Sequence, residues 1–150
     1  MIDLRHLSPD ELSDASALCI RSKAHWGYGE AFMAACVDEL TLTVDDIARD
    51  QVIIASIGGD LVGVAQVSCD AEGCYLEKLF VDPDHMGKGV GRRLFGWSVQ
   101  AARDLGGTEM IVEADPDAAP FYRAMACRDA GEAPSGSIPG RSLPRLVYDL

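Results

Sequence analysis

The chain has 150 residues, which is enough for one domain with a sizeable hydrophobic core. Hydrophobic residues make up 48% of it and the mean hydropathy is +0.05, values typical of a folded domain and not of a disordered chain. Thirteen Lys and Arg against 24 Asp and Glu give a net charge of -11, which argues against general binding to nucleic acids or acidic membranes, because both need a basic surface.

The first half of the chain predicts a strand, two helices and a meander of three strands. Ser8, Pro9 and Glu11 have the pattern of a helix start, and WGYG breaks the helical spacing before a second helix. Short turn sequences, GGD and DAEG, separate three β-branched runs. The elements are expected as strand 2–7, helices 8–25 and 32–40, a short turn at 43–46, and strands 51–57, 61–69 and 74–81.

The second half predicts a helix, a strand, a short helix and two closing strands. Apolar residues keep a helical period from Val90 to Leu105, and Gly106 ends that helix. No linker or internal repeat divides the chain, so we expect one mixed α/β domain over residues 1–150. Its remaining elements are expected as strand 108–114, helix 116–125, strand 127–132, loop 133–144 and strand 145–150.

The stretch DPDHMGKGVGRRLF, residues 82–95, concentrates glycines and basic residues in an acidic chain. Lys88 is followed by Gly89, so it is not a Walker A loop, and the spacing of its glycines does not fit a dinucleotide fold. A helix that begins near Gly89 would point unpaired N–H groups and a positive dipole end at a ligand. The pattern therefore favours a phosphate site, and the alternative is a plain solvated turn.

LEKLFVDPDHMGKGVGRRLF resembles the central motif of the GCN5-related N-acetyltransferases, the GNAT family. In that motif an apolar strand ends L-x-V-x-P, and [QR]-x-x-G-x-[GA] opens a long helix; the matching residues here are Leu79, Val81, Pro83, Gly89 and Gly91. The family often follows with N-x-x-A-x-x-F-Y-x-x-x-G-F, in register here with Asp115, Ala118, Phe121 and Tyr122. The chain departs from the family at Met86 in place of Gln or Arg, Asp115 in place of Asn, and Ala126-Cys127 in place of Gly-Phe.

The resemblance implies a GNAT-like α/β fold with a mixed, mostly antiparallel sheet flanked by helices. Its central strands, 75–82 and 108–114, would splay apart, and the pantetheine of acetyl-CoA would fill the gap. Acetyl-CoA is implied as co-substrate, and no metal is expected because His6, His25 and His85 lack ligand spacing. The expected cofactor-binding residues are Leu79, Phe80, Val81, Met86, Gly87, Lys88, Gly89, Val90, Gly91, Arg92, Asp115, Ala118 and Phe121.

The resemblance also implies catalytic and acceptor residues. Tyr122 is expected to act as the general acid for the leaving thiolate. Glu77 is a candidate general base, and the alternative is a solvated carboxylate in an enzyme without a dedicated base. The acceptor is expected between residues 24–29 and 133–141, where Trp26, Tyr28 and Arg141 would contact it.

Cysteine usage and the chain start predict a cytoplasmic protein with reduced thiols. The five cysteines include no C-x-x-C pair, and a disulfide between Cys69 and Cys74, which flank a turn, is not expected. The opening MIDLRHLSPDEL lacks the apolar core of a signal peptide, and no apolar run is long enough to span a membrane. The oligomeric state, including a homodimer, stays open.

We therefore expect an N-acetyltransferase that transfers an acetyl group from acetyl-CoA to a primary amine by direct attack in a ternary complex. An acidic chain suits an amine partner, and a domain without a docking extension favours a small molecule over a protein acceptor. Two alternatives stay open: a non-catalytic acyl-CoA-binding or sensing domain on the same fold, and an interaction domain without a cofactor. Neither a nucleic acid nor a membrane is expected as a partner.

Overall fold

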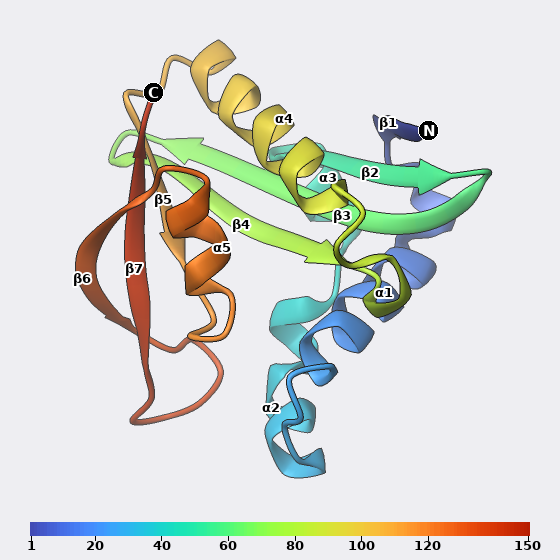
Figure 1. Ribbon diagram of the computed structural model, residues 1–150, viewed down its shortest axis with the longest axis horizontal. Coiled ribbons are helices and arrows are strands. Elements are labelled where there is room, and N and C mark those ends of the chain that lie inside the picture. The colour runs from blue at the N-terminus through green and yellow to red at the C-terminus, as the bar shows by residue number, and fades with distance from the viewer.

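Strands and helices follow one another in the predicted order in the computed structural model, which describes residues 1–150 (Figure 1). They are β1 (Ile2–His6), the 3₁₀ turn η1 (Pro9–Glu11), α1 (Leu12–Ala24), α2 (Glu30–Leu40), α3 (Val44–Arg49), β2 (Gln51–Ile57), β3 (Asp60–Asp70), β4 (Gly73–Val81), the 3₁₀ turn η2 (Pro83–His85), α4 (Val90–Asp104), β5 (Glu109–Glu113), α5 (Ala119–Ala124), β6 (Arg128–Pro134) and β7 (Ser142–Asp149). The last two strands are longer than expected, so the loop between them shortens to residues 135–141. No helix is long and apolar enough to cross a membrane.

The seven strands form one sheet in the order β1-β2-β3-β4-β5-β7-β6. Every neighbouring pair is antiparallel except β4 and β5, which are parallel. These two strands are paired only at Cys74 with Met110 and at Tyr75 with Ile111. Figure 1 shows them leaving the same corner of the sheet and diverging. The mixed, mostly antiparallel sheet with a splayed central pair is therefore confirmed.

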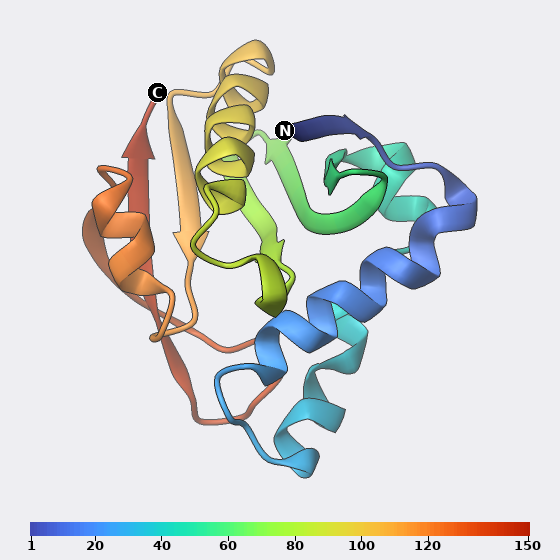
Figure 2. The same ribbon diagram turned by 45° about the vertical axis from the view of Figure 1, so that its right-hand side comes forward.

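Helices cover both faces of the sheet, because the strands of its first half are apolar on both sides (Figure 2). Along β2, Val52 and Ile54 pack in one cluster with residues of α1 and α2. The alternate residues Ile53 and Ala55 pack in another cluster with Leu94 of α4. The sheet is thus fixed between α1 and α2 on one face and α4 on the other.

Gly63 of β3 determines how closely α4 approaches the sheet. A Cβ at this position would lie 2.7 Å from Leu94 Cδ1 and 2.9 Å from Val90 Cγ1, nearer than packed carbon atoms come. Without a side chain there, the first turns of α4 rest on β3. This contact holds the N-terminus of α4 beside the end of β4, where the glycine turn connects them.

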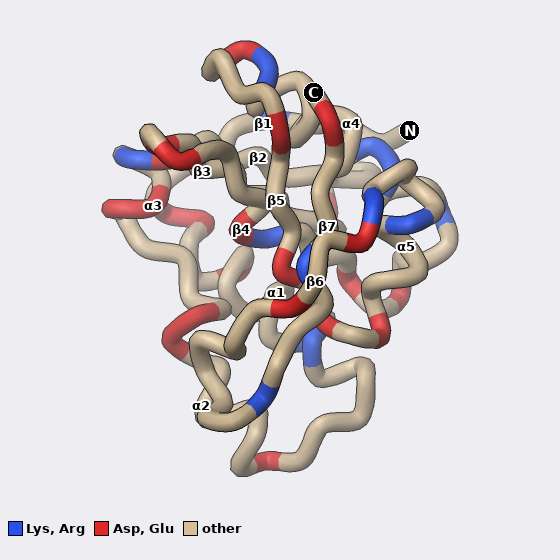
Figure 3. Tube along the Cα trace, turned by 90° about the vertical axis from the view of Figure 1, so that its left-hand side faces the viewer, with Lys and Arg blue, Asp and Glu red and all other residues tan.

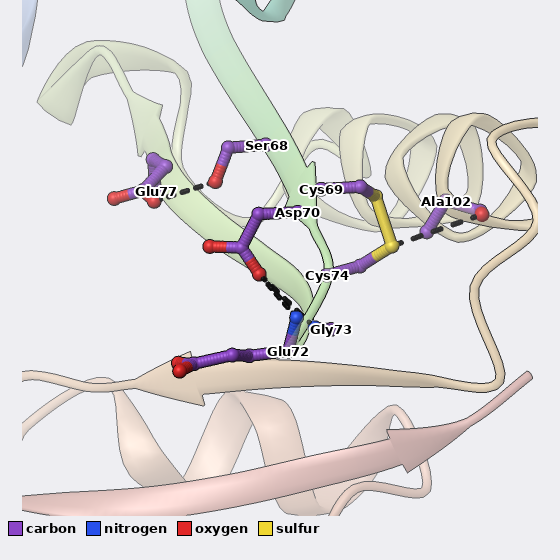
Figure 4. The surroundings of a disulfide bond; sticks show 8 residues. All are labelled: Ser68, Cys69, Asp70, Glu72, Gly73, Cys74, Glu77 and Ala102. Carbon is purple, nitrogen blue, oxygen red and sulfur yellow. Dashed lines mark hydrogen bonds between the residues drawn. A yellow bond between two sulfur atoms is a disulfide. The ribbon is translucent and has the colours of Figure 1, made fainter.

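The structure contains a disulfide between Cys69 and Cys74, so the expectation that both thiols are reduced is wrong (Figure 4). A two-residue turn joins β3 to β4 after Asp70, whose carboxylate accepts from the N–H of Glu72 (2.8 Å) and of Gly73 (3.2 Å). This tight turn places the two cysteines directly opposite each other, with their Cα atoms 4.0 Å apart. The other three cysteines, Cys19, Cys36 and Cys127, are free and buried.

Replacing Cys69 by Ser is expected to lower the free energy of unfolding by roughly 2 kcal/mol, because the disulfide closes a short loop in the unfolded chain. Cys69 is chosen because Cys74 is buried and a hydroxyl there would lose solvation. Urea unfolding with and without a reductant measures the effect. The difference from wild type should vanish under reducing conditions, and equal stabilities under oxidising conditions would contradict the prediction.

Candidate active site

A cavity of about 520 Å³ lies between the diverging strands β4 and β5. One wall is the second half of β4, from Leu76 to Val81. The glycine turn closes one end, α5 contributes the opposite wall, and the loop at 135–141 contributes Ser135, Ser137 and Arg141. The separation of the two strands therefore creates the site.

The edge of β4 that faces this cavity has no strand partner beyond Tyr75. On its other edge, Leu79, Phe80 and Val81 are paired with β3. Unpaired N–H and C=O groups along such an edge can bind an extended chain as if it were a further strand. The pantetheine of acetyl-CoA, with its two amide groups, fits this edge.

The glycine turn leaves backbone N–H groups open at the start of the 15-residue helix α4. Gly87 and Gly89 have φ values of +80° and +86°, and no atom lies within 4 Å of where a Cβ would stand on either residue. The helix N-terminus adds a positive dipole end, and Arg92 lines the cavity. This end of the cavity suits phosphate groups.

Most of the expected cofactor-binding residues line the cavity, but Lys88 and Val90 do not. Val90 is 1% exposed and packs in the core with Leu94, since the first turn of α4 points it toward the sheet. Lys88 is exposed outside the cavity wall. Those that line it are Leu79, Phe80, Val81, Met86, Gly87, Gly89, Gly91, Arg92, Asp115, Ala118 and Phe121.

Tyr122 of α5 lines the cavity from a buried position, with a side chain that is 6% exposed. Its ring packs against Phe95 and Phe121, with centroids 6.1 Å and 5.2 Å away. Burial raises the pKa of the Tyr122 phenol, so the hydroxyl stays protonated at neutral pH. No side chain or backbone group accepts a hydrogen bond from the Tyr122 hydroxyl, and this oxygen is not fully buried. The hydroxyl is therefore free to donate its proton within the cavity.

Glu77 lies on β4 and lines the same cavity with an exposed carboxylate. Ser68 Oγ on β3 donates to its Oε1 at 2.7 Å (Figure 4). This hydrogen bond orients the carboxylate and leaves its other oxygen without a partner. Glu77 also lines a second, neighbouring cavity.

Asp115, just after β5, is the centre of a network that joins four segments of the chain. Its Oδ2 accepts from the Tyr28 hydroxyl (2.6 Å) and from Lys23 Nζ (3.3 Å), and Arg141 lies 3.7 Å away. Arg141 also donates to the Tyr28 hydroxyl at 2.8 Å. Burial raises the pKa of Asp115, but hydrogen bonds from Tyr28 and the Asp117 N–H, together with the Lys23 ammonium, outweigh it and hold the pKa below its usual range.

The three expected acceptor residues lie at the same end of the cavity, but they differ in whether they line it and in whether they are already bonded to other residues. Trp26 is 40% exposed and lines the cavity. Tyr28 stacks on Phe32, with ring centroids 4.0 Å apart, and does not line it. Arg141 lines the cavity with its charge already paired to Asp115. The hydrogen bond between Tyr28 and Arg141 therefore joins segments 24–29 and 133–141, which are expected from the sequence on either side of an opening for the acceptor.

Several cavity residues carry no signal in the sequence. Lys23, Glu39 and Lys78 lie in helices or strands where charged residues are ordinary, and only the fold brings them together. His85 lines the cavity beside Met86, and its Nδ1 is buried without a hydrogen-bond partner. Neither spacing nor a known motif marks these positions.

Replacing Asp115 by Asn is expected to reduce stability at pH 7 by about 1–3 kcal/mol, since the amide keeps the shape but not the charge. The folded-state pKa of Asp115 lies below its unfolded value of about 3.9. The stability that its charge provides is therefore fully present above the unfolded pKa and is lost as the pH falls through the folded-state pKa. Unfolding in urea at pH values from 7 down to 3 tests this. A wild-type advantage that does not shrink at low pH would contradict it.

Comparison with known proteins points to one family. The family model described as "Acetyltransferase (GNAT) domain" matches residues 11–132. The chain is similar to the PaiA N-acetyltransferase of Thermoplasma acidophilum in complex with coenzyme A, with a TM-score of 0.80 and 15% identity over 100% of this chain and 99% of that one. It is also similar to a GCN5-related N-acetyltransferase of Rhodopseudomonas palustris, with a TM-score of 0.79 and 22% identity over 99% of this chain and 95% of that one. A third similar structure is YncA of Salmonella typhimurium with acetyl-CoA, with a TM-score of 0.71 and 16% identity over 99% of this chain and 94% of that one. No curated protein matches the chain significantly.

Proposed function

Because the chain belongs to the GNAT acetyltransferase family and is an acyltransferase, we propose that it transfers an acetyl group from acetyl-CoA to the primary amine of a small molecule. The observation that carries the proposal is the gap between β4 and β5. It joins an unpaired strand edge to a glycine turn at a helix N-terminus, with a protonated tyrosine in its wall. A strand-like ligand that ends in phosphates fits this combination.

Acetyl-CoA supplies the acetyl group as a thioester, and the chain would hold it by two kinds of contact. The free edge of β4 near Leu79, Phe80 and Val81 would bind the pantetheine amides and the thioester carbonyl. The N–H groups of the glycine turn, with Arg92, would bind the pyrophosphate. Met86 offers no polar side chain there, so backbone groups carry the contact.

The proton transfers are assigned to two side chains on opposite walls. The attacking amine must first lose a proton, and the exposed carboxylate of Glu77 is placed to accept it. The departing thiolate gains a proton from the Tyr122 hydroxyl, which is neutral and has no other acceptor. A domain that only binds or senses acyl-CoA would have no use for this free donor, which favours the enzyme over that alternative.

Asp115 does not oppose cofactor binding, although it stands where the family often has Asn. The ammonium of Lys23 and the guanidinium of Arg141 offset its carboxylate. An anionic ligand therefore meets a group of three charged side chains with a net charge of +1. The substitution thus costs little in cofactor affinity.

Calorimetry with acetyl-CoA, followed by a thiol-release assay over a panel of amines, tests the proposed function. We expect binding of acetyl-CoA and of CoA, with thiol release only from acetyl-CoA in the presence of an accepted amine. Binding without turnover on any amine or peptide would support the sensing domain. No binding at all would support an interaction domain in which the glycines serve packing alone.

A further inference from the structure

His85, in the turn η2, has a side-chain nitrogen that is buried without a hydrogen-bond partner. That atom is Nδ1; the other ring nitrogen, Nε2, also forms no hydrogen bond within the chain but is not fully buried. The residue lines the cavity directly before Met86 and the glycine turn. A buried polar atom without a partner is costly, and beside a ligand site it indicates that binding changes its state.

The carboxylate of Asp82 lies close to this nitrogen, with 3.9 Å between Nδ1 and Oδ1. Arg21 of α1 donates to Oδ2 of the same carboxylate at 2.9 Å, and the N–H of Asp84 donates to Oδ1 at 3.0 Å. Burial raises the pKa of Asp82, but these two hydrogen bonds and the charge of Arg21 outweigh it and hold the pKa below its usual range. The carboxylate is therefore charged at neutral pH, and its hydrogen bonds hold it in place.

Neither neutral form of the His85 imidazole suits these surroundings. With the proton on Nδ1, Nε2 is an acceptor and cannot bind a phosphate oxygen. With the proton on Nε2, the bare Nδ1 lies beside the Asp82 carboxylate and no group donates to it. The doubly protonated ring gives both nitrogens a partner, with Nδ1–H toward Asp82 and Nε2–H toward an anion in the cavity. Histidine is the side chain whose charge ordinarily changes between pH 5 and 8, so an arriving anion can favour this form.

An anionic ligand approaches a molecule with a net charge of -11. Figure 3 shows the Asp and Glu positions spread over helices and strands and not gathered in one patch. The charged residues of the elements around His85 are Arg21 and Lys23 of α1, Asp82 and Asp84 of η2, Lys88 of the glycine turn and Arg92 of α4. Arg21 and Lys23 are already paired with carboxylates, whereas Lys88 and Arg92 form no ion pair. One further positive charge at this end of the cavity therefore adds substantially to the attraction of phosphate groups.

We propose that His85 binds the pyrophosphate of acetyl-CoA as an imidazolium, with Nε2–H donating to a phosphate oxygen and Nδ1–H donating to Asp82. The inference rests on the proposed function and adds a binding residue to it. The proton comes from solution and stays on the ring while the cofactor is bound, so binding and protonation are linked. Nδ1 has to move by about 1 Å to reach hydrogen-bond distance from Asp82. The imidazolium supplies the polar contact and the charge that the side chain of Met86 does not.

Titration calorimetry in two buffers of different ionisation enthalpy measures how many protons are taken up with acetyl-CoA. At about pH 7.5 the wild type should take up at least about 0.5 proton per ligand more than His85→Gln, because glutamine donates a hydrogen bond but cannot gain a charge. The wild type should also bind about 10-fold more tightly than this variant near pH 6.5, and within about 3-fold of it near pH 8.5. His6→Gln, on β1 outside the cavity, is the matched control and should behave like the wild type.

Two further measurements identify the partners of the ring. Asp82→Asn keeps an acceptor for the N–H of Asp84 but removes the charge beside Nδ1, so its proton uptake should fall to that of His85→Gln. Acetyl-CoA that lacks the 3′-phosphate retains the pyrophosphate, so the difference between wild type and His85→Gln should persist with this ligand. Loss of the difference would assign the ring to the 3′-phosphate and overturn the pyrophosphate contact.

Equal proton uptake by the wild type and His85→Gln would overturn the inference. A loss of affinity in the variant that is the same at every pH would also overturn it, because a neutral hydrogen-bond donor would then account for the contact. The readout is binding and needs no accepted amine. A protein that takes up the linked proton but acetylates no amine would refute the proposed function and leave this inference standing, whereas a wild type that does not bind acetyl-CoA would refute both.

Discussion

Replacing Gly89 by Glu is expected to weaken acetyl-CoA binding at least about 100-fold, or by about 2.8 kcal/mol. Gly89 immediately precedes α4, with a φ of +86° and open space where its Cβ would stand. The new carboxylate would occupy the space that phosphate needs and would repel it. Strain from the positive φ costs about 1–2 kcal/mol, less than the free energy of unfolding of a typical domain, so the variant should still fold.

Calorimetry on both proteins measures this effect, and Gly58→Glu is its matched control. Gly58 has a φ of +59° with no neighbour near its Cβ position, and it lies in the β2–β3 turn outside the cavity. The control carries similar backbone strain and the same added charge. It should bind acetyl-CoA like the wild type, and an unchanged affinity in the Gly89 variant would refute the phosphate site.

Replacing Tyr122 by Phe is expected to reduce turnover about 10²–10⁴-fold, the usual effect of losing a general acid or base. The ring remains between Phe95 and Phe121, so the packing of α5 should survive. Acetyl-CoA affinity should stay nearly unchanged, because only the proton donor is removed. Steady-state kinetics with an accepted amine, together with calorimetry, separate the two effects.

Tyr148→Phe is the control for this variant. Tyr148 of β7 also packs against Phe95, with ring centroids 5.5 Å apart, but does not line the cavity. It should keep full turnover. If Tyr122→Phe does so too, Tyr122 serves packing alone and the thiolate takes its proton from elsewhere.

The positions of Tyr28 and Arg141 change the view of how the acceptor reaches the site. From the sequence they are expected on two sides of an opening, as separate contacts for the acceptor. In the structure they are bonded to each other and to Asp115, so they stabilise the wall of the cavity.

The order of the elements and the glycine turn before α4 could be predicted from the sequence, because each depends on local patterns. The splayed strands were implied by the resemblance to a known family and not by a local pattern. The β-branched runs of β2 and β3, the helical period of α4 and the glycines at 87–91 act over a few residues. The motif around Tyr122 is equally local, and its match to a known family connects it to the glycine turn.

Only the tertiary structure determined which distant side chains meet. Tyr28 reaches Asp115 and Arg141 from 87 and 113 positions away, and no spacing rule marks a contact between loops so far apart. The second cavity forms from α2, α3 and two strands, whose acidic residues look like ordinary solvated positions one by one. Val90 points inward because α4 docks on Gly63, and Cys69 meets Cys74 because a two-residue turn sets the strand register. Contacts of this kind depend on how elements pack, which local sequence patterns do not encode.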